Sequence, residues 1–375
     1  MGVADSALTV ELCTDEAEFG ALATAWAGLH RRCRTATPFQ SHAWLHSWWL
    51  SYGTRGRLRV VLVRRGGELV AAAPLMRAYV PLPVLVPLGG AISDFTDVLL
   101  DDACADEAAD ALADGLSELA RGALIDFREV RSGAAVERIY ERWSGPRLRL
   151  TGSLCLELPS TSLPELLGRL PAPRAQRARA KIRKLQAVGV ERRVVGLDEV
   201  DDSMRTLLRL HQLQWQGRKV TPEHLRPRFS EHLIRSVGLM VREGGAVVTE
   251  FRLDDAVVAT DLTLLSSHLA GGYLYGADPR LRERKVDVAT MLLHACTEYH
   301  ASTEAADSGR SRVLSLLRGD EPYKHHWRPE EATNHRLLLA RRRTAPVLRA
   351  AAWEAAARSR AKEFRRKRGE RQERS

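Results

Sequence analysis

The sequence predicts an α+β protein made of two similar halves and a basic helical tail. At 375 residues the chain is longer than one typical domain. Segments with strand-like alternation are interspersed with segments of helical spacing, and their order in the first half recurs in the second. We therefore expect one domain over residues 1–150, a second over 151–340, and a tail over 341–375.

The first half is expected to combine strands with amphipathic helices. Asp15 opens a segment of helical spacing, Ser41 caps another, and Gly66-Gly67 between two apolar runs indicates a β-hairpin. The expected strands span 7–13, 57–65, 68–76, 95–100 and 123–130, and the expected helices span 15–33, 41–53 and 105–120.

The second half should hold a mixed, mostly antiparallel sheet, because three strands in a row are separated by short polar turns. Gly189 is expected to end a strongly basic helix. The expected strands span 153–159, 190–195, 246–253, 256–265, 269–277 and 311–317, and the expected helices span 172–189, 197–218, 222–237 and 286–301. The tail from 346 to 374 is rich in Ala and Arg and has high helical propensity.

Cysteine usage and charge restrict the class of protein. The five cysteines are scattered and never form a C-x-x-C pair, which argues against a disulfide framework or a zinc site, so no metal is expected. No basic, apolar leader opens the chain, and we expect a cytoplasmic protein. Residues 341–375 contain thirteen Arg/Lys and four Glu, which is +9 of the chain's net +10. We therefore expect no specific nucleic-acid partner, and a tail that contacts an anionic membrane surface or a partner protein. The sequence predicts no particular oligomeric state.

An unusual mixture of side chains follows the apolar segment 311–317. Residues 318–327 read RGDEPYKHHW. Asp320 is expected to cap a helix and to form an ion pair with Lys324 one turn further on, while Tyr323 and Trp327 lie one turn apart as an aromatic pair. One interpretation is a capped helix whose aromatic side chains pack on the sheet. The other makes Lys324 a cation near a developing oxyanion or a phosphate.

Four stretches of the sequence carry a resemblance to a known superfamily. They are PFQSHAWLHSWWLSYG (38–53), RARAKIRKLQAVG (177–189), FRLDDAVVATDLTLL with GGYLYGADP (251–265 and 271–279), and LLRGDEPYKHHW (316–327). Together they resemble GNAT (N-acetyltransferase-like) acyltransferases, and more narrowly the CelD-like group found with polysaccharide biosynthesis, whose relatives are FemABX-type aminoacyltransferases. The last stretch is the most specific, since Gly-Asp-x-x-Tyr-Lys-x-x-Trp after a strand is characteristic of that group.

The resemblance implies two tandem GNAT-like domains, of which the first is degenerate and the second is the acyltransferase. It also implies an acyl-CoA co-substrate, expected to be acetyl-CoA, whose pyrophosphate lies at a helix N-terminus. The sequence departs from the family at this point, because no glycine lies between Gly276 and Gly309. We expect Arg282, Arg284 and Lys285 to contact the donor instead. Loss of donor binding is the alternative.

The resemblance also suggests roles for other residues. Tyr323 is expected to donate a proton to the leaving thiolate, and Tyr275 to border the acyl pocket. Asp261 is a carboxylate inside an apolar strand, which needs a partner or a task, and is the candidate base.

Candidate acceptor contacts are His211, Trp215 and Trp327, with Lys181 from the basic helix. That helix is either a solvated surface helix or a cationic wall for a phosphate-bearing substrate.

We predict an enzyme that transfers an acyl group from acyl-CoA to an amine or amino-sugar acceptor, in polysaccharide or cell-envelope biosynthesis. One alternative is a non-catalytic accessory protein that binds a glycan or nucleotide-sugar. Another is a transferase that depends on aminoacyl-tRNA and has the same fold.

Overall fold

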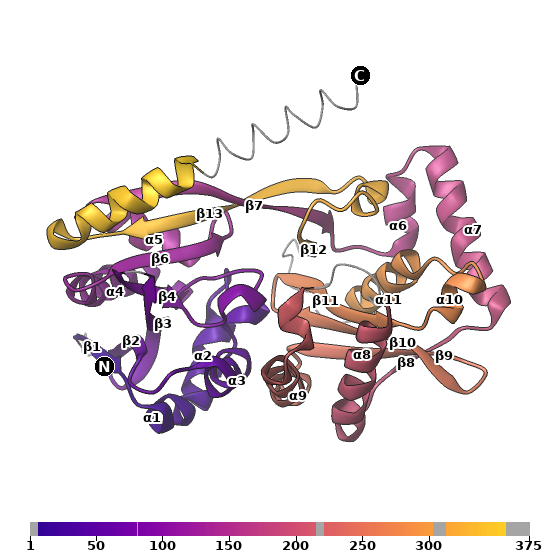
Figure 1. Ribbon diagram of the computed structural model, residues 1–375, viewed down its shortest axis with the longest axis horizontal. Helices are drawn as coiled ribbons and strands as arrows, with labels where there is room; N and C mark the ends of the chain where they lie inside the picture. The colour runs from indigo at the N-terminus through magenta and orange to yellow at the C-terminus, as the bar shows by residue number, and fades with distance from the viewer. Residues whose placement is uncertain (1–6, 81, 215–220, 303–312, 358–375) are drawn as a thin grey trace, which may run out of the picture.

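The computed structural model describes residues 7–80, 82–214, 221–302 and 313–357. Within these residues the two halves share one mixed, 13-stranded sheet (Figure 1). The strand order is β1-β2-β3-β4-β6-β13-β7-β12-β11-β10-β9-β8, and β5 pairs with β3. None of the described helices has the length and apolar character needed to cross a membrane.

The first half follows the predicted order of elements, except that the strand over 82–87 and the helix over 135–142 were not predicted. The Ser41 hydroxyl accepts a hydrogen bond from the Trp44 backbone and caps its helix as expected. The Asp15 carboxylate accepts hydrogen bonds from the backbone of Ala17 and Glu18 and caps the first helix. The predicted helix 15–33 is divided at Leu22. Strands are β1 Leu8–Cys13, β2 Leu58–Arg65, β3 Glu68–Val80, β4 Leu82–Pro87, β5 Leu99–Leu100 and β6 Leu124–Val130. Helices are α1 Glu16–Ala21, α2 Ala23–Arg32, α3 His42–Tyr52, α4 Ala105–Leu119 and α5 Ala135–Arg142.

The second half contains the predicted meander, β9–β10–β11, and the basic helix α7, which Gly189 ends with a φ of 79°. Its strands are β7 Arg147–Pro159, β8 Glu191–Val194, β9 Ala246–Leu253, β10 Ala256–Leu265, β11 Leu269–Ala277, β12 Val313–Arg318 and β13 Glu330–Leu339. Its helices are α6 Leu163–Gly168, α7 Ala172–Val188, α8 Val200–Gln214, α9 Pro227–Arg242, α10 Arg280–Glu283 and α11 Val288–Ser302. Residues 345–357 are also helical.

The two halves repeat one order of elements. The first runs β1, α1–α2, α3, β2, β3, β4, α4, β6, and the second runs β8, α8, α9, β9, β10, β11, α11, β12. Each half has one parallel strand pair at the equivalent place, β4 with β6 and β11 with β12, and both pairs are short. The chain therefore has a tandem GNAT-like fold, in which the two sheets are continuous with each other.

Strands β7 and β13 join the halves (Figure 1). β13 pairs with β6 on one side and β7 on the other, and β7 continues to β12. Although β13 is the last strand of the second half in sequence, its residues Leu337 and Leu339 are fully buried in the core of the first half. The expected division at 150/151 and 340/341 stays a prediction.

Helices α3 and α9 hold the halves together below the sheet junction. The Ser47 hydroxyl of α3 donates to the carbonyl of His232 on α9 at 3.0 Å, and the Trp44 ring meets the His232 ring edge-on at 4.5 Å. Both aromatic side chains are fully buried. This contact fixes the first half beside the cavity described next.

Candidate active site

The site lies where β11 and β12 separate. These parallel strands pair only from Leu269–Gly271 to Val313–Ser315. Past Ser315 the β12 strand is irregular: Leu317 has a φ of 59°, unusual for a side chain that is not glycine, and its backbone N–H donates to the Ser315 hydroxyl at 3.1 Å. The irregularity turns β12 away from β11 and opens a gap in the sheet.

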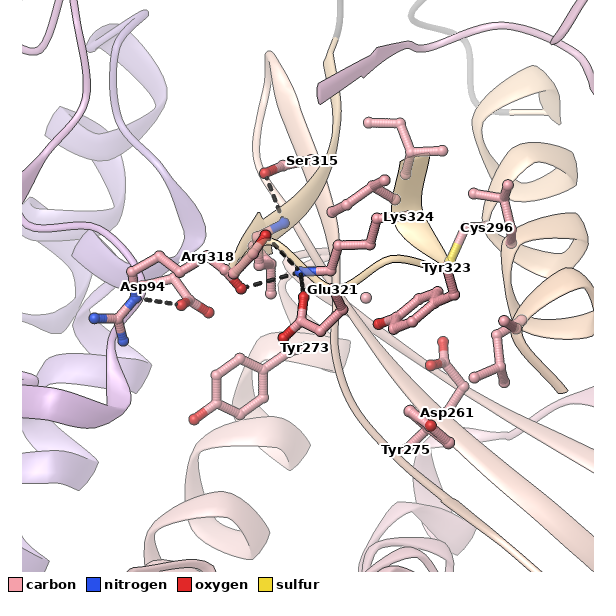
Figure 2. Close-up of a pocket in the computed structure, with 18 of the residues that line it drawn as sticks. Asp94, Asp261, Tyr273, Tyr275, Cys296, Ser315, Arg318, Glu321, Tyr323 and Lys324 are labelled. Carbon is pink, nitrogen blue, oxygen red and sulfur yellow. Dashed lines mark hydrogen bonds and ion pairs between the residues drawn. The ribbon is translucent and has the colours of Figure 1, made fainter. Parts of the chain in front are cut away.

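A cavity of about 610 Å³ occupies this gap (Figure 2). That volume is in the range of sites for small molecules and cofactors. Polar groups reach it from β10, β11 and the segment after β12, and a mostly apolar wall comes from α11 and β12. The polar lining includes Asp261, Tyr273, Tyr275, Glu321, Tyr323 and Lys324. The apolar lining includes Leu292, Leu293, Cys296, Leu314, Leu316 and Trp327.

Asp261 is the buried carboxyl group of the cavity. It lies on β10 opposite Tyr275 of β11, is 3% exposed, and accepts a hydrogen bond from the Thr263 hydroxyl at 2.8 Å. Burial raises the pKa of Asp261 to about 7, although the bond from Thr263 opposes the rise. A carboxyl group that is half ionised near neutral pH is suited to accept a proton from a substrate and release it again.

Lys324 is held in a different local structure from the one predicted. Residues 324–327 form a short 3₁₀ helix whose first flanking residue is Tyr323, so Asp320 does not cap a helix. The expected Asp320–Lys324 pair is also wrong, because Asp320 pairs with His325 and Lys324 pairs with Glu321 at 2.7 Å. The turn starts later because Gly319, with a φ of 115°, continues the chain reversal that begins at Leu317.

The Lys324 ammonium lies in the cavity wall with its donors occupied (Figure 2). It bonds the carbonyls of Arg318 at 3.0 Å and Gly319 at 3.4 Å, besides the Glu321 carboxylate. An ammonium has three N–H donors, and these three acceptors match them in number. The geometry makes Lys324 a clamp for the 318–321 loop, which keeps the Glu321 carboxylate at the cavity.

The two aromatic residues of this segment differ in exposure. Trp327 is 7% exposed and packs in the core under α6 and α7, with its surface reaching the cavity wall. Tyr323 is 47% exposed and lines the cavity. Burial of its hydroxyl end, with the nearby Glu321 charge, raises the pKa of Tyr323 to about 12, so the phenol stays protonated at neutral pH.

A chain of hydrogen bonds connects β11 with a second imidazole at the cavity. His211 Nδ1 lies 2.8 Å from the Tyr275 carbonyl, and its Nε2 lies 3.2 Å from Nδ1 of His224. Because a carbonyl only accepts, His211 must donate through Nδ1, and its neutral ring then accepts from His224 Nδ1–H. Burial, followed by the effect of His211, lowers the pKa of His224 to about 4, so His224 is neutral and its Nε2 is an acceptor. His224 lines the cavity, whereas His211 lies behind it.

The first half of the chain supplies part of the rim. Asp94, on the loop before β5, pairs with Arg318 at 2.6 Å, and the Tyr273 hydroxyl donates to the Ile92 carbonyl at 2.8 Å. Ala91, Ile92 and Asp94 all line the cavity. Sequence reasoning missed Asp94, Arg318, His224 and Glu321. The Gly-Asp turn at 319–320 lies between Arg318 and Glu321 and could have indicated both of them. Nothing in the local sequence distinguishes Asp94 or His224.

The residues expected to bind the CoA pyrophosphate lie away from the cavity lining. Arg284 pairs with Asp254 at 2.9 Å, and Arg282 lies on α10, outside the lining. Lys285 adopts a left-handed backbone with a φ of 57° after α10. Trp215 lies outside the described residues.

The N-terminus of α11 already holds a carboxylate. The Asp287 side chain accepts from the Thr290 N–H at 2.9 Å, and its other oxygen pairs with Lys181 at 2.9 Å. Burial alone would raise the pKa of Asp287, but the bonds from Thr290 and Lys181 lower it overall, so it stays charged. Lys181, expected to contact substrate, is thus engaged with the cap of α11. Within the described residues, no group of three His, Cys, Asp or Glu side chains is arranged to hold a metal ion.

Comparisons with known proteins agree with this architecture. Residues 173–325 match the family described as acetyltransferase (GNAT) domain. No curated protein sequence matches the chain. Among solved structures, FemX superposes with a TM-score of 0.59 at 12% identity, over 88% of this chain and 96% of that one.

Two further structures have a similar fold. The C-terminal domain of a putative lysylphosphatidylglycerol synthetase from Agrobacterium fabrum gives a TM-score of 0.55 at 12% identity, over 90% of this chain and 96% of that one. The structure described as L-PGS from Bacillus licheniformis gives a TM-score of 0.53 at 11% identity, over 89% of this chain and 95% of that one. At these identities the similarity establishes the fold alone.

Proposed function

We propose, from the premise that residues 173–325 form an acyltransferase domain of the GNAT superfamily, that this chain transfers an acyl group to an amine held in the β11–β12 cavity. The observation that carries the proposal is the Asp261 carboxyl group, which lies in that cavity with a pKa of about 7. An amine must lose a proton to become a nucleophile, and the proton needs an acceptor of matched pKa.

The reaction is a direct displacement in a ternary complex. The amine nitrogen bonds to the acyl carbon as its proton passes to the Asp261 carboxylate, and the carbon–sulfur bond of a thioester donor then breaks. The leaving thiolate takes a proton from the Tyr323 phenol, which solvent restores. Nε2 of His224 accepts a hydrogen bond from the amine and orients it. Positioning and exclusion of water supply most of the rate enhancement.

The donor in our first proposal is acyl-CoA, with acetyl-CoA as the simplest case, because GNAT domains generally use such thioesters. The acceptor is an amine or amino sugar, in polysaccharide or cell-envelope biosynthesis. Only the resemblance of the sequence to the CelD-like group supports this part of the proposal.

Asp287 favours a second candidate, in which the donor is an aminoacyl ester of transfer RNA. The carboxylate of Asp287 accepts a hydrogen bond from the Thr290 N–H at the start of α11, where a CoA pyrophosphate would bind in a GNAT domain. A second anion there meets electrostatic repulsion. An aminoacyl ester requires no pyrophosphate at this helix, and its transfer balances in the same way, with an alcohol as the leaving group.

Calorimetry with CoA thioesters, followed by turnover assays, separates these candidates. We expect micromolar binding of one acyl-CoA and release of free thiol with an amine acceptor, lost in Asp261→Asn. If no thioester binds and aminoacyl-tRNA supports transfer, the second candidate is correct. If neither donor supports transfer to any amine, the chain is a binding protein of the kind considered from the sequence, and the enzymatic proposal is wrong.

A further inference from the structure

A helix near the C-terminus lies against the sheet of the first half with one side uncovered (Figure 1). Residues 345–357 form this helix, drawn in yellow, and Val347, Leu348 and Ala351 pack on Leu338 and neighbouring apolar side chains. Trp353 points the other way and is 76% exposed. Arg349, also exposed, precedes it by four residues and so lies on the same side of the helix.

The exposure of Trp353 stands out against the other tryptophans that the structure describes. Trp26, Trp44, Trp48, Trp49, Trp143 and Trp327 are all buried. An indole has an apolar ring and one N–H donor, and this combination favours the boundary between water and lipid. Packing against the described residues does not account for an indole at this position.

An open hollow of about 760 Å³ lies at the start of this helix and is lined by four arginines. They are Arg121, Arg341, Arg342 and Arg343, with Ser144, Gly145 and Pro146 completing the wall. The lining includes no carboxylate. Arg121 pairs with Glu118, but both side chains are more than 60% exposed, so solvent screens the pair. Arg342 and Arg343 are exposed and make no ion pair with a described residue.

The hollow is held in place by the fold. The Thr344 hydroxyl is buried and donates to the Ala120 carbonyl at 3.1 Å, while the backbone N–H of Arg341 donates to Thr344 Oγ1 at 2.9 Å. Nη1 of Arg341 donates to the Ser144 hydroxyl at 3.1 Å. These bonds anchor the arginine turn to the end of α4, so its positive charges are concentrated at one rim of the molecule.

We propose that this surface docks on an anionic lipid bilayer. The guanidinium groups of Arg341, Arg342, Arg343 and Arg121 would bind lipid phosphates, for which the planar fork of arginine is suited. Trp353 lies ten residues beyond Arg343, roughly 15 Å along the helix, and enters the headgroup layer beside them.

Charge complementarity identifies the partner as a membrane. Residues 358–375, which follow this helix in sequence, contain nine Arg/Lys and three Glu, so the excess of positive charge continues along the chain. Basic residues beside an anionic leaflet each add to binding, and an aromatic anchor supplies the second, apolar signal that stable attachment requires.

Vesicle sedimentation tests the proposal. At about 0.15 M salt we expect the full chain to sediment with vesicles of 30% phosphatidylglycerol in phosphatidylcholine, and to stay in solution with phosphatidylcholine alone. Arg342→Gln with Arg343→Gln should weaken binding at least tenfold, because each basic residue near the surface contributes about a factor of five. The matched control is Arg177→Gln with Lys184→Gln, which removes the same charge from exposed positions on α7 and should leave binding unchanged.

Quenching by brominated lipids tests the role of Trp353 separately. Lipids brominated in the upper part of the acyl chain should quench part of the tryptophan fluorescence of the wild type. In Trp353→Phe this quenching should be absent. The proposal would be overturned if the chain bound neutral vesicles as tightly as anionic ones, or if the α7 control lost as much vesicle binding as Arg342→Gln with Arg343→Gln. It would also be overturned if brominated lipids quenched Trp353→Phe as strongly as the wild type. Binding of an RNA duplex through these arginines, without vesicle binding, would overturn it too.

Discussion

At the scale of single residues, one buried carboxyl group determines what the cavity can do. Asp261 is buried on a mostly apolar strand, and the Thr263 hydroxyl of the same strand donates the hydrogen bond that stabilises its charge. The sequence alone identified this residue, because a carboxylate inside an apolar strand is costly unless it has a partner or a function. The sequence did not indicate the imidazole of His224, whose role depends on a contact with His211 across a turn.

The unusual pKa of Asp261 predicts how stability varies with pH. Its pKa is about 7 in the folded chain against a usual 3.8, so the native state binds more protons than the unfolded state between these values. The free energy of unfolding should therefore fall as pH rises from about 4 to 7, by about 1.4 kcal/mol for each pKa unit at most. Asp261→Asn should remove this part of the pH dependence.

Thermal denaturation from pH 4.5 to 8 measures this effect. Asp97 has a similarly raised pKa and contributes its own pH dependence, so the quantity of interest is the difference between wild type and variant. Asp198→Asn, at an exposed position, is the control. If the difference between wild type and Asp261→Asn does not change with pH, the assignment of this pKa is wrong.

At the scale of elements, two short segments shape the site, and sequence patterns were least reliable there. The segment after β12 was predicted as a helix from Asp320, but the left-handed residues Leu317 and Gly319 change the chain direction first. Such backbone geometry depends on β12 leaving the sheet, which local propensity does not encode. The α11 helix was predicted well from its apolar spacing, whereas its cap by Asp287 was not foreseen.

Replacement of Lys324 tests whether it acts as a clamp. Lys324→Ala leaves two carbonyls and the half-exposed Glu321 carboxylate without their donor, so we expect a loss of about 1–3 kcal/mol in unfolding free energy. Glu321→Gln keeps a side-chain acceptor for the ammonium and should cost less. Urea denaturation measures the unfolding free energy of both variants and of the wild type. A fully stable Lys324→Ala chain with a large loss in kcat alone would instead indicate direct participation in the reaction.

Neutralising the cap of α11 tests which anions this helix accepts. Asp287→Asn preserves an oxygen for the Thr290 N–H but removes the negative charge, so CoA should bind roughly two- to fivefold more tightly than to wild type. Asp254→Asn, which removes an exposed charge paired with Arg284, is the control. Calorimetric titration measures the dissociation constant of CoA for each variant and for the wild type. Weaker CoA binding in Asp287→Asn would mean that the carboxylate supports the donor and does not repel it.

At the scale of the whole molecule, the sequence predicted the tandem order of elements, while the connection between the halves came from the structure. Alternation and helical spacing are local, so most strands from β1 to β12 could be placed by residue range. Strand β4 was not predicted, and only Leu99–Leu100 of the expected strand 95–100 forms a strand. Strand β13 was not foreseen, because Glu330–Asn334 is polar and only its last residues are apolar. The hydrogen bonds of β13 to β6 and β7, far away in sequence, make it a strand. Likewise, the cavity rim from Ala91 to Asp94 depends on how the halves meet.

The shared sheet predicts cooperative unfolding. Because Leu337 and Leu339 complete the core of the first half, and α3 packs on α9, neither half should unfold alone. Calorimetry of the full chain should give one transition whose van't Hoff and calorimetric enthalpies agree. Two resolved transitions would contradict the structural role given to β7 and β13.

The pH dependence of acyl transfer tests the central proposal most directly. With whichever donor supports turnover, kcat/KM should rise with pH to a plateau, with a midpoint near the Asp261 pKa of about 7. Asp261→Asn should lower the plateau about 10²- to 10⁴-fold, as expected when a general base is lost. An Asp261→Asn enzyme with wild-type rates and an unchanged profile would contradict the proposal.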